Sequence, residues 1–543
     1  MLITEGVVAS PTVAGKFLPG SRPGRDPIGD VALIENHDEA YHVWRDRGVE
    51  EMVPVHIDAH HDMYGSWTPS SDKGITIANY VLPALESGIV SEVFWLVPDK
   101  SWASAKDRQD TEQIVEKIVT KNGGSRSDLQ VSERQIRSVV FGKPLTVCTL
   151  DILPEIDGGT LLDIDVDFFI IPNISYSGIV NYGELPWCWP ADLISRLSAT
   201  KLRTDLVTIA YSVEGVYTPL QWKYLGDEVA QRLQQINGSE VGIIQGAKEM
   251  RRAALAAQSR DYDAAEQHYR AANQLWPASA APLLHLAHLS VVMGRPANGK
   301  QLYQQAVALD PSYQTPYNSA GFWYFSNGRY AAAERAHRRT LLLNAESAYA
   351  YLGLGWIAAR KKRWGEAEDL LRKALARNGQ SIDAHRVRGV VLSKMGRREE
   401  AIQAFNQTLK LALRGYKSVL DGLIITAPKE AFQSDPYHGR VHIFLAHLHA
   451  QAGDLAAAIN GYRMGIAMGK DSVSVRSRLA LLCLRQHKWG ASARESWQAI
   501  AKIPGSLKEF GERLFHYLRW KLRKGRWRLW ARRKTEAPVS IWQ

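Results

Sequence analysis

The apolar residues of the first 235 positions lie in short runs separated by longer, more polar, helix-like stretches. The runs occupy residues 31–35, 53–57, 93–97, 145–149, 161–169 and 206–211. Several are rich in Val, Ile and Leu without strict polar alternation, which is typical of strands covered by helices on both faces. Strands that alternate with helices predict a three-layer α/β domain with a mostly parallel sheet. In such sheets, ligands bind beyond the carboxyl ends of the strands.

Beyond residue 241 the strand pattern ends, and small residues recur at a step of 34. The two series are Ala265, Gly299, Ala333, Ala367 and Ala401, and Ala272, Ala306, Thr340, Ala374 and Thr408, with Pro277, Pro311, Gly294, Gly328 and Gly396 at repeat ends and turns. The pattern resembles the tetratricopeptide repeat, in which small residues let paired helices approach closely. It predicts an all-α solenoid. The resemblance implies a groove that holds a peptide or a partner protein.

A chain of 543 residues is longer than one folding unit usually is. The patterns divide it into an irregular lead-in over residues 1–29, the α/β domain over 30–235, the repeat array over 243–505 and a tail over 506–543. The repeat pattern is interrupted near residues 410–437, where we expect an extended helix pair or a lid.

Cysteine usage and hydropathy indicate the setting of the protein. Cys148, Cys188 and Cys483 are odd in number and far apart, so they predict neither a disulfide framework nor a thiolate metal site. No run of apolar residues approaches the roughly 18 that a membrane span needs. A reducing, cytoplasmic setting is expected.

The positive charge of the chain is concentrated in the tail. Residues 513–534 hold ten Lys and Arg and no Asp or Glu, so they account for most of the net charge of +11. Leu514, Leu518, Leu522 and Trp530 follow near-helical steps, which predicts a basic amphipathic helix. Such a helix either lies on an anionic membrane surface, binds an acidic partner, or caps the repeat array. Nucleic acid is the least favoured partner, because no nucleic-acid motif accompanies the charge.

Two motifs in the α/β domain concentrate potential metal ligands. Asp58, His60 and Asp62 follow the apolar run at 53–57 at steps of two, and alternate residues of an extended chain point the same way. Residues 161–169 carry three carboxylates at the same steps: Asp163, Asp165 and Asp167. Like charges so close together repel each other and lose hydration unless a cation compensates them. The alternative is that these acids are solvated strand ends or turn formers.

The Asp-Ala-His-His-Asp and Asp-Ile-Asp-Val-Asp runs resemble the two metal-binding signatures of the arginase, agmatinase and histone-deacetylase superfamily. In those ureohydrolases a ligand His follows an earlier strand, and His37 lies in the matching place, before a helix-like stretch at 38–47. The resemblance covers residues 30–230. It implies one metal held by His37, Asp58, Asp62 and Asp165, and another held by His60, Asp58, Asp165 and Asp167. Asp58 and Asp165 would bridge the two.

The resemblance implies hydrolysis by a pair of divalent cations, which can activate water at neutral pH. Oxygen-rich ligation with some imidazole favours two Mn²⁺, with Fe²⁺, Co²⁺ and Zn²⁺ as alternatives. Glu214, in a loop beyond the run at 206–211, matches a carboxylate that grips the guanidinium group in arginases. The alternative for Glu214 is a solvated loop residue. Asp163 has no assigned role, and orienting a ligand is a candidate one.

The chain also departs from the arginase pattern. Glu35-Asn-His37 replaces the usual Gly-Gly-Asp-His-Ser, the second motif lacks a following Asp-Pro, and Asn79 lies in the region where arginases place a further histidine. Asn79 is therefore a candidate substrate contact, and specificity for free arginine is not expected. The departures are similar to those of peptide arginases, which convert peptidyl arginine to ornithine. The rival hypotheses are a deacetylase-like amidohydrolase with one metal, and a repeat scaffold whose front domain is not catalytic.

Overall fold

A computed structural model describes much of the chain. The described residues are 16–18, 28–65, 75–156, 159–175, 185–200, 202–213, 217–234, 242–314, 321–322, 324–325, 328–412, 416–420, 423–427 and 436–500. The chain divides into two compact units, Met1–Ile357 with Val419–Ile425, and Ala358–Ser418 with Thr426–Gln543. The expectations for Glu214 and for the tail over 506–543 lie outside the described residues.

The front domain is built on a nine-stranded sheet with the order β1-β2-β9-β8-β3-β4-β7-β6-β5. Its strands are β1 (Lys16–Leu18), β2 (Ile28–Ile34), β3 (Val53–Ile57), β4 (Val93–Leu96), β5 (Gln130–Val131), β6 (Gln135–Val140), β7 (Lys143–Cys148), β8 (Thr160–Asp165) and β9 (Thr204–Ala210). The six neighbours from β2 to β7 pair in parallel, whereas β1, β5 and β6 are antiparallel strands at the two edges. The expected mostly parallel sheet is confirmed.

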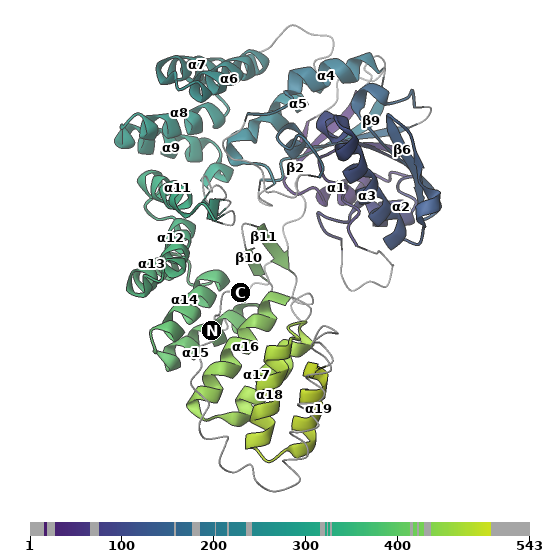
Figure 1. Ribbon diagram of the computed structural model, residues 1–543. Coiled ribbons are helices and arrows are strands. Elements are labelled where there is room, and N and C mark those ends of the chain that lie inside the picture. Colours follow the sequence, from purple (N-terminus) through teal and green to yellow (C-terminus); the bar gives the residue numbers. More distant parts are fainter. Residues whose placement is uncertain are drawn as a thin grey trace, which may run out of the picture. The chain divides into compact units, whose positions relative to one another are not determined.

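Helices cover both faces of this sheet (Figure 1). The helices of the domain are α1 (Glu39–Asp46), α2 (Val81–Glu86), α3 (Ala105–Lys121), α4 (Pro190–Ala199) and α5 (Tyr224–Gln234). Ala32 and Ile34 of β2 pack in one core with Trp44 of α1, while the intervening Val31 and Leu33 pack in the core of the opposite face. Alternate residues of a strand point to opposite faces, so a run without polar alternation is buried on both sides.

The second motif is only partly a strand. The apolar run at 161–169 predicts one continuous strand, but β8 ends at Asp165 and a 3-10 turn, η4 (Val166–Phe169), follows. The side chain of Asp165 accepts a hydrogen bond from the Asp167 backbone N–H and so caps this turn. Asp167 therefore leaves the sheet on a turn and does not share a strand face with the other two carboxylates.

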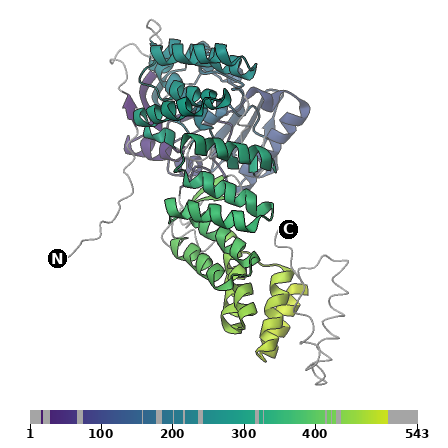
Figure 2. The same ribbon diagram turned by 90° about the vertical axis from the view of Figure 1, so that its left-hand side faces the viewer.

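After the sheet domain in the sequence, the described part of the chain is mostly helical. The first unit holds α6 (Gly242–Gln258), α7 (Tyr262–Leu275), α8 (Ala281–Val292), α9 (Pro296–Leu309), α11 (Tyr330–Leu343) and the start of α12 (Ala348–Arg360). The second unit holds α13 (Trp364–Arg377), α14 (Ile382–Lys394), α15 (Arg398–Ala412), α16 (Pro436–Ala452), α17 (Leu455–Ala467), α18 (Val473–Arg485) and α19 (Trp489–Ile500). Within each unit the helices follow one another as antiparallel pairs (Figures 1 and 2). The expected all-helical array is confirmed.

The small residues of the 34-residue repeat allow paired helices to pack closely, as their spacing predicts. Ala265, Ala333, Ala367 and Ala401 are fully buried. A Cβ atom on Gly299 would lie 2.8 Å from the backbone oxygen of Ala287, so only glycine allows the two helices to approach this closely. Gly294, Gly328 and Gly396 have φ angles of 76°, 71° and 78°, in the left-handed region that turns between paired helices use.

The expected helix pair is not found among the described residues of the interruption. Between α15 and α16 the described residues form a two-stranded sheet of β10 (Tyr416–Leu420) and β11 (Leu423–Ala427). These runs are rich in Val, Ile, Leu and Tyr, which favour strands. None of the described helices has the length and apolar character that crossing a membrane requires.

Candidate metal centre

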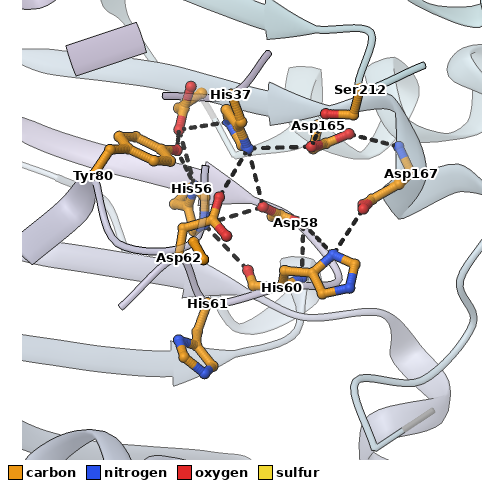
Figure 3. A network of polar contacts seen from close by, with 12 residues as sticks. His37, His56, Asp58, His60, His61, Asp62, Tyr80, Asp165, Asp167 and Ser212 are labelled. Atoms are coloured by element: carbon orange, nitrogen blue, oxygen red, sulfur yellow. Dashed lines mark hydrogen bonds and ion pairs between the residues drawn. The ribbon is translucent and has the colours of Figure 1, made fainter. Parts of the chain in front are cut away.

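The two motifs meet at the carboxyl ends of four neighbouring parallel strands, β2, β9, β8 and β3. His37 follows β2, Asp58 follows β3, Asp165 ends β8 and Ser212 follows β9. Figure 3 shows these side chains converging from separate strands. The topology explains how residues more than a hundred positions apart come together, because parallel neighbours end at the same edge of the sheet.

The first metal locus is centred on the Nδ1 atom of His37. This atom lies 3.2 Å from Asp58 Oδ2, 3.1 Å from Asp62 Oδ2 and 3.2 Å from Asp165 Oδ2. Ligands about 2.1 Å from an octahedral cation, at right angles to each other, are about 3.0 Å apart. Each of the three carboxylate oxygens is therefore at the spacing of a neighbouring ligand from His37 Nδ1. These four residues are the ones that the resemblance implies for the first metal.

The second locus involves His60. Its Nδ1 atom lies 2.7 Å from Asp167 Oδ2 and 3.7 Å from Asp58 Oδ1. Asp58 has its Oδ2 at the first locus, and its Oδ1, which lies nearer the second, accepts the backbone N–H of His60 at 2.7 Å. Asp165 is placed similarly, since its Oδ2 lies at the first locus and its Oδ1 accepts the backbone N–H of Asp167 at 2.9 Å. Bridging by Asp58 and by Asp165 stays a prediction.

Two groups of three side chains could each hold a metal ion. They are His37, His56 and Asp58, and Asp58, His60 and Asp167, with all ligand atoms of a group within 4.8 Å of one another. Three atoms of the cluster, His37 Nδ1, Asp58 Oδ2 and Asp167 Oδ1, are buried without a hydrogen-bond partner in the described structure. Buried polar atoms normally have partners, so this arrangement fits cations as the missing ones.

Asp163 lies beneath the first locus and accepts several hydrogen bonds. Its Oδ2 atom lies 3.1 Å from His37 Nε2, 2.9 Å from His56 Nδ1 and 2.6 Å from the hydroxyl of Tyr80. The hydroxyl of Thr208 donates to the other oxygen. His56, Asp163 and Thr208 form one row across the sheet, because His56 pairs with Asp163 and Asp163 with Thr208.

This contact fixes the orientation of His37. Because Asp163 accepts at Nε2, the proton of a neutral His37 lies on that nitrogen and the Nδ1 lone pair faces the three carboxylates. Metal-binding histidines usually donate their other N–H in this way. Asp163 is placed to orient a ligand.

Burial and charge shift the pKa values of the cluster in opposite directions. Burial alone would lower the pKa of His37, but the charge of Asp163, the hydrogen bond to it and the neighbouring carboxylates of Asp165 and Asp58 raise that pKa well above its usual value. Burial and the neighbouring Asp58 raise the pKa of Asp62. Burial, followed by the charges of Asp165 and Asp58, raises the pKa of Asp167. Without cations, this excess of carboxylates must be relieved by protons.

A turn brings the potential ligands of the first motif together. The sequence pattern predicts instead that they converge by alternation along an extended chain. β3 ends at Ile57, and Asp62 has a φ of 47°, in the left-handed region. This turn brings Asp62 back to His37. The side chain of His61, between two expected ligands, points away from the carboxylates (Figure 3). Burial lowers the pKa of His61 to about 3.

A small hollow opens onto the cluster and encloses about 300 Å³ of empty space, its open mouth included. Its walls include His37, His60, Asp62, Asp165 and Asp167, together with Tyr64, Ile77, Ala78, Ser212 and Tyr217. The ring of Tyr217 stands edge-on to that of His60, with 5.0 Å between centroids. No Lys or Arg is found among the described lining residues. The hollow therefore favours a cationic group over an anionic one.

The structure does not bring every expected site residue to this hollow. The side chain of Asn79 accepts the backbone N–H of Thr76 at 2.8 Å and so closes a local turn. Its substrate role stays a prediction, as does that of Glu214.

Three residues of the cluster, His56, Tyr80 and Ser212, are not predicted from the sequence. The hydroxyl of Ser212 donates to Asp165 at 2.6 Å. The step of two that joins Asp58 to His60 also reaches back to His56, so the spacing could have found that residue.

Comparison with known proteins places the repeats. The tetratricopeptide repeat family model matches residues 324–382, and no curated protein matches the chain. Among solved structures, the Cut9–Hcn1 hetero-tetramer of APC/C is 14% identical, with a TM-score of 0.30 over 54% of this chain and 52%, about half, of the other. YrrB, described as a repeat protein with an unusual peptide-binding site, is 19% identical, with a TM-score of 0.25 over 40% and 97% of the two chains. For Pseudomonas aeruginosa pilF the values are 15% identity and a TM-score of 0.26 over 51% and 97%. The chain thus carries tetratricopeptide repeats in its C-terminal half, behind an α/β domain with a mixed sheet.

Proposed function

We propose that the α/β domain is a binuclear metal hydrolase of the arginase type, which cleaves a carbon–nitrogen bond of a guanidino group. The observation that carries the proposal is the set of three carboxylate oxygens from Asp58, Asp62 and Asp165, each 3.1 to 3.2 Å from His37 Nδ1. Oxygen-rich ligation with few imidazoles supports Mn²⁺. His37, Asp58, Asp62, Asp165, His60 and Asp167 would hold the two ions.

A pair of divalent cations supplies activated water at neutral pH. The residues of this chain would orient the pair and the substrate. Asp58 would contribute one oxygen to each locus, and Ser212 holds Asp165 by donating to its Oδ2 atom. His60, with 27% of its side chain exposed, is the ligand nearest to solvent. Hydrolysis would add water to the guanidino carbon and release urea, leaving an amine.

Charge supports a cationic substrate. Five carboxylates, those of Asp58, Asp62, Asp163, Asp165 and Asp167, surround the two loci. Two divalent cations would leave one net negative charge when the histidines are neutral. A planar guanidinium carries one positive charge and makes charge-assisted hydrogen bonds to carboxylates. Glu214 is the further residue proposed to grip it.

The repeats support a peptide as the carrier of the guanidino group. Tetratricopeptide arrays bind proteins or peptides, and a bound peptide has a high effective concentration at a site on the same chain. We therefore propose conversion of peptidyl arginine to ornithine, as in peptide arginases.

The test is metal counting and mass spectrometry on the full chain purified with Mn²⁺. Two ions per chain and loss of CH₂N₂ from arginine-containing peptides are expected. Asp58→Ala and Asp165→Ala should abolish both. The matched control is Asp110→Asn on α3, a partly exposed carboxylate outside the cluster, which should leave both unchanged. A folded protein that binds no divalent metal would overturn the proposal. One ion per chain, with release of acetate from an added acetyllysine peptide, would favour the deacetylase-like alternative. Metal binding without turnover would favour the scaffold.

A further inference from the structure

A second hollow lies beside the metal cluster and shares His60 and Tyr64 with the first. It has a volume of about 180 Å³. Part of its wall is apolar, with Met63, Trp95 and Ile118 among the lining residues. This volume is below the roughly 300 to 1,000 Å³ of pockets that take drug-sized ligands, so the hollow suits only a small organic group.

The polar groups of this second hollow include three hydrogen-bond donors. Lys117 and Lys121 lie one helical turn apart on α3, so both ammonium groups are on the same side of the helix. The third donor is His61, which is only 7% exposed. Its Nδ1 accepts the backbone N–H of Met63 at 2.9 Å, so its ring is neutral and carries the proton on Nε2. Within the described structure no acceptor is paired with that N–H.

The two hollows have opposite charge. No Asp or Glu is found among the described residues that line the second, whereas the first is lined by Asp62, Asp165 and Asp167 without Lys or Arg. Two ammonium groups and an imidazole N–H donor next to apolar walls favour an anion that is attached to an organic group. A substrate that fills both hollows would thus carry a cation at one end and an anion at the other.

We propose that the second hollow binds a carboxylate carried by the substrate beside the reacting guanidino group. The inference rests on the proposed function and names the substrate more closely. Lys117, Lys121 and His61 would hold the carboxylate while the guanidino group lies at the metal cluster. The carboxylate has two sources, the α-carboxylate of a C-terminal arginine and the side chain of an acidic residue next to an internal arginine.

Turnover of three peptides by the full Mn²⁺-loaded chain tests the proposal and separates the sources. One peptide ends in arginine with a free carboxylate, one has arginine followed by glutamate and an amidated end, and one has arginine followed by glutamine and an amidated end. We expect kcat/KM for one of the two acidic substrates to exceed that of the neutral peptide by about tenfold. In the Lys117→Gln, Lys121→Gln double variant this preference should be lost, with kcat/KM for the acidic substrates falling to that for the neutral peptide.

The control variant loses two positive charges, as the test variant does, but elsewhere in the domain. Lys100→Gln, Lys106→Gln removes two positive charges that do not line the hollow, and it should keep the preference. Equal kcat/KM for all three peptides, or a preference that survives in the Lys117, Lys121 variant, would overturn the proposal.

A binding measurement separates failure of the hollow from failure of the proposed chemistry. Calorimetric titration with phenylacetate, an apolar carboxylate without a guanidino group, should detect binding to the wild-type chain and to the control, and at least fivefold weaker binding to the Lys117, Lys121 variant. Binding that is absent, or equal in all three proteins, would contradict the carboxylate site even if guanidino hydrolysis occurs. Selective binding without any turnover would leave the hollow in place and reject the hydrolase.

Discussion

At the scale of single residues, Asp163 differs from the other carboxylates of the cluster. It is fully buried, and its oxygens accept from His37, His56, Tyr80 and Thr208. Burial would raise the pKa of Asp163, but the charge of His37 and hydrogen bonds to both histidines lower it. The carboxylate is therefore ionised and holds His37 in the ring orientation that turns Nδ1 towards the metal locus.

Replacing Asp163 with asparagine should weaken metal binding while leaving all the proposed ligands in place. An amide is a weaker acceptor for His37 Nε2–H, so the ring is less firmly oriented and its Nδ1 atom is less basic. We expect the apparent Kd for Mn²⁺ to rise about 10- to 100-fold in a metal-buffered titration. Thr208→Val removes only one of the donors to Asp163, and it should change the Kd by less than about threefold. An unchanged Kd in Asp163→Asn would contradict this role.

Residue spacing predicted much of this site and left the rest open for physical reasons. Asp58, His60 and Asp62 could be selected because three potential ligands at steps of two are rare after an apolar run. His56 lies two residues before Asp58, but it is inside the strand, where a histidine is usually interpreted as a core residue. Ser212 and Tyr80 carry no motif, and only the pairing of β8 with β9 and the packing of α2 bring them to the cluster.

At the scale of elements, long buried strands were the easiest to predict. The run at 53–57 coincides with β3, in which Val55 and Ile57 are buried in the core of one face while Pro54 and His56 are buried on the other. β6 was missed because its residues alternate between buried and exposed at the edge of the sheet, and a short run of this kind gives a weak apolar signal. The turn after Asp165 could not be predicted from apolar residues, because Phe168 and Phe169 are buried as completely in a 3-10 turn as in a strand.

Helix α11 carries a histidine that is buried against the neighbouring helices without a polar partner among the described residues. His337 is fully buried, and neither ring nitrogen has a hydrogen-bond partner in the described structure. The ring fills space that two glycines provide, since a Cβ atom on Gly353 or Gly321 would collide with it. Phe322 packs edge-on against it at 5.1 Å. Burial lowers the pKa of His337 to about 3.

This histidine should make the first unit less stable in acid. Between pH 6.5 and about 3 the unfolded chain binds a proton at residue 337 that the folded chain excludes, so stability is lost as pH falls through that window. At pH 5 the loss is about 2 kcal/mol relative to pH 7.5. In guanidinium unfolding curves, His337→Leu should reduce the difference between the two pH values by that amount. Replacing the exposed His487 with asparagine should not, and an equal reduction in both variants would contradict the assignment.

At the scale of the whole molecule, the first repeat helices share a core with the sheet domain. Leu225 of α5 and Ala247 and Met250 of α6 belong to the same buried cluster as the strands. Polar contacts reinforce the packing, since His285 Nε2 lies 2.9 Å from the backbone oxygen of Gln221. The change from strand to helix periodicity near residue 241 marks a change of secondary structure. This change of periodicity does not show which apolar faces pack against each other. The expected boundary at residues 235 to 243 therefore does not predict that the sheet domain folds independently of the repeats.

A chain that ends after residue 240 should therefore fail to fold stably. Removing α6 to α9 exposes the apolar face of α5, and each large side chain left uncovered costs about 1.5 to 3 kcal/mol. A few such losses approach the 5 to 15 kcal/mol that usually stabilises a domain. A chain that ends after residue 357 keeps the shared core. We expect the shorter chain to be poorly soluble and to bind an apolar dye, and the longer one to unfold cooperatively and to retain Mn²⁺ binding. Equal melting temperatures for the two chains would mean that the shared core adds little to the front domain, because the helices removed would then have covered no surface that the sheet needs.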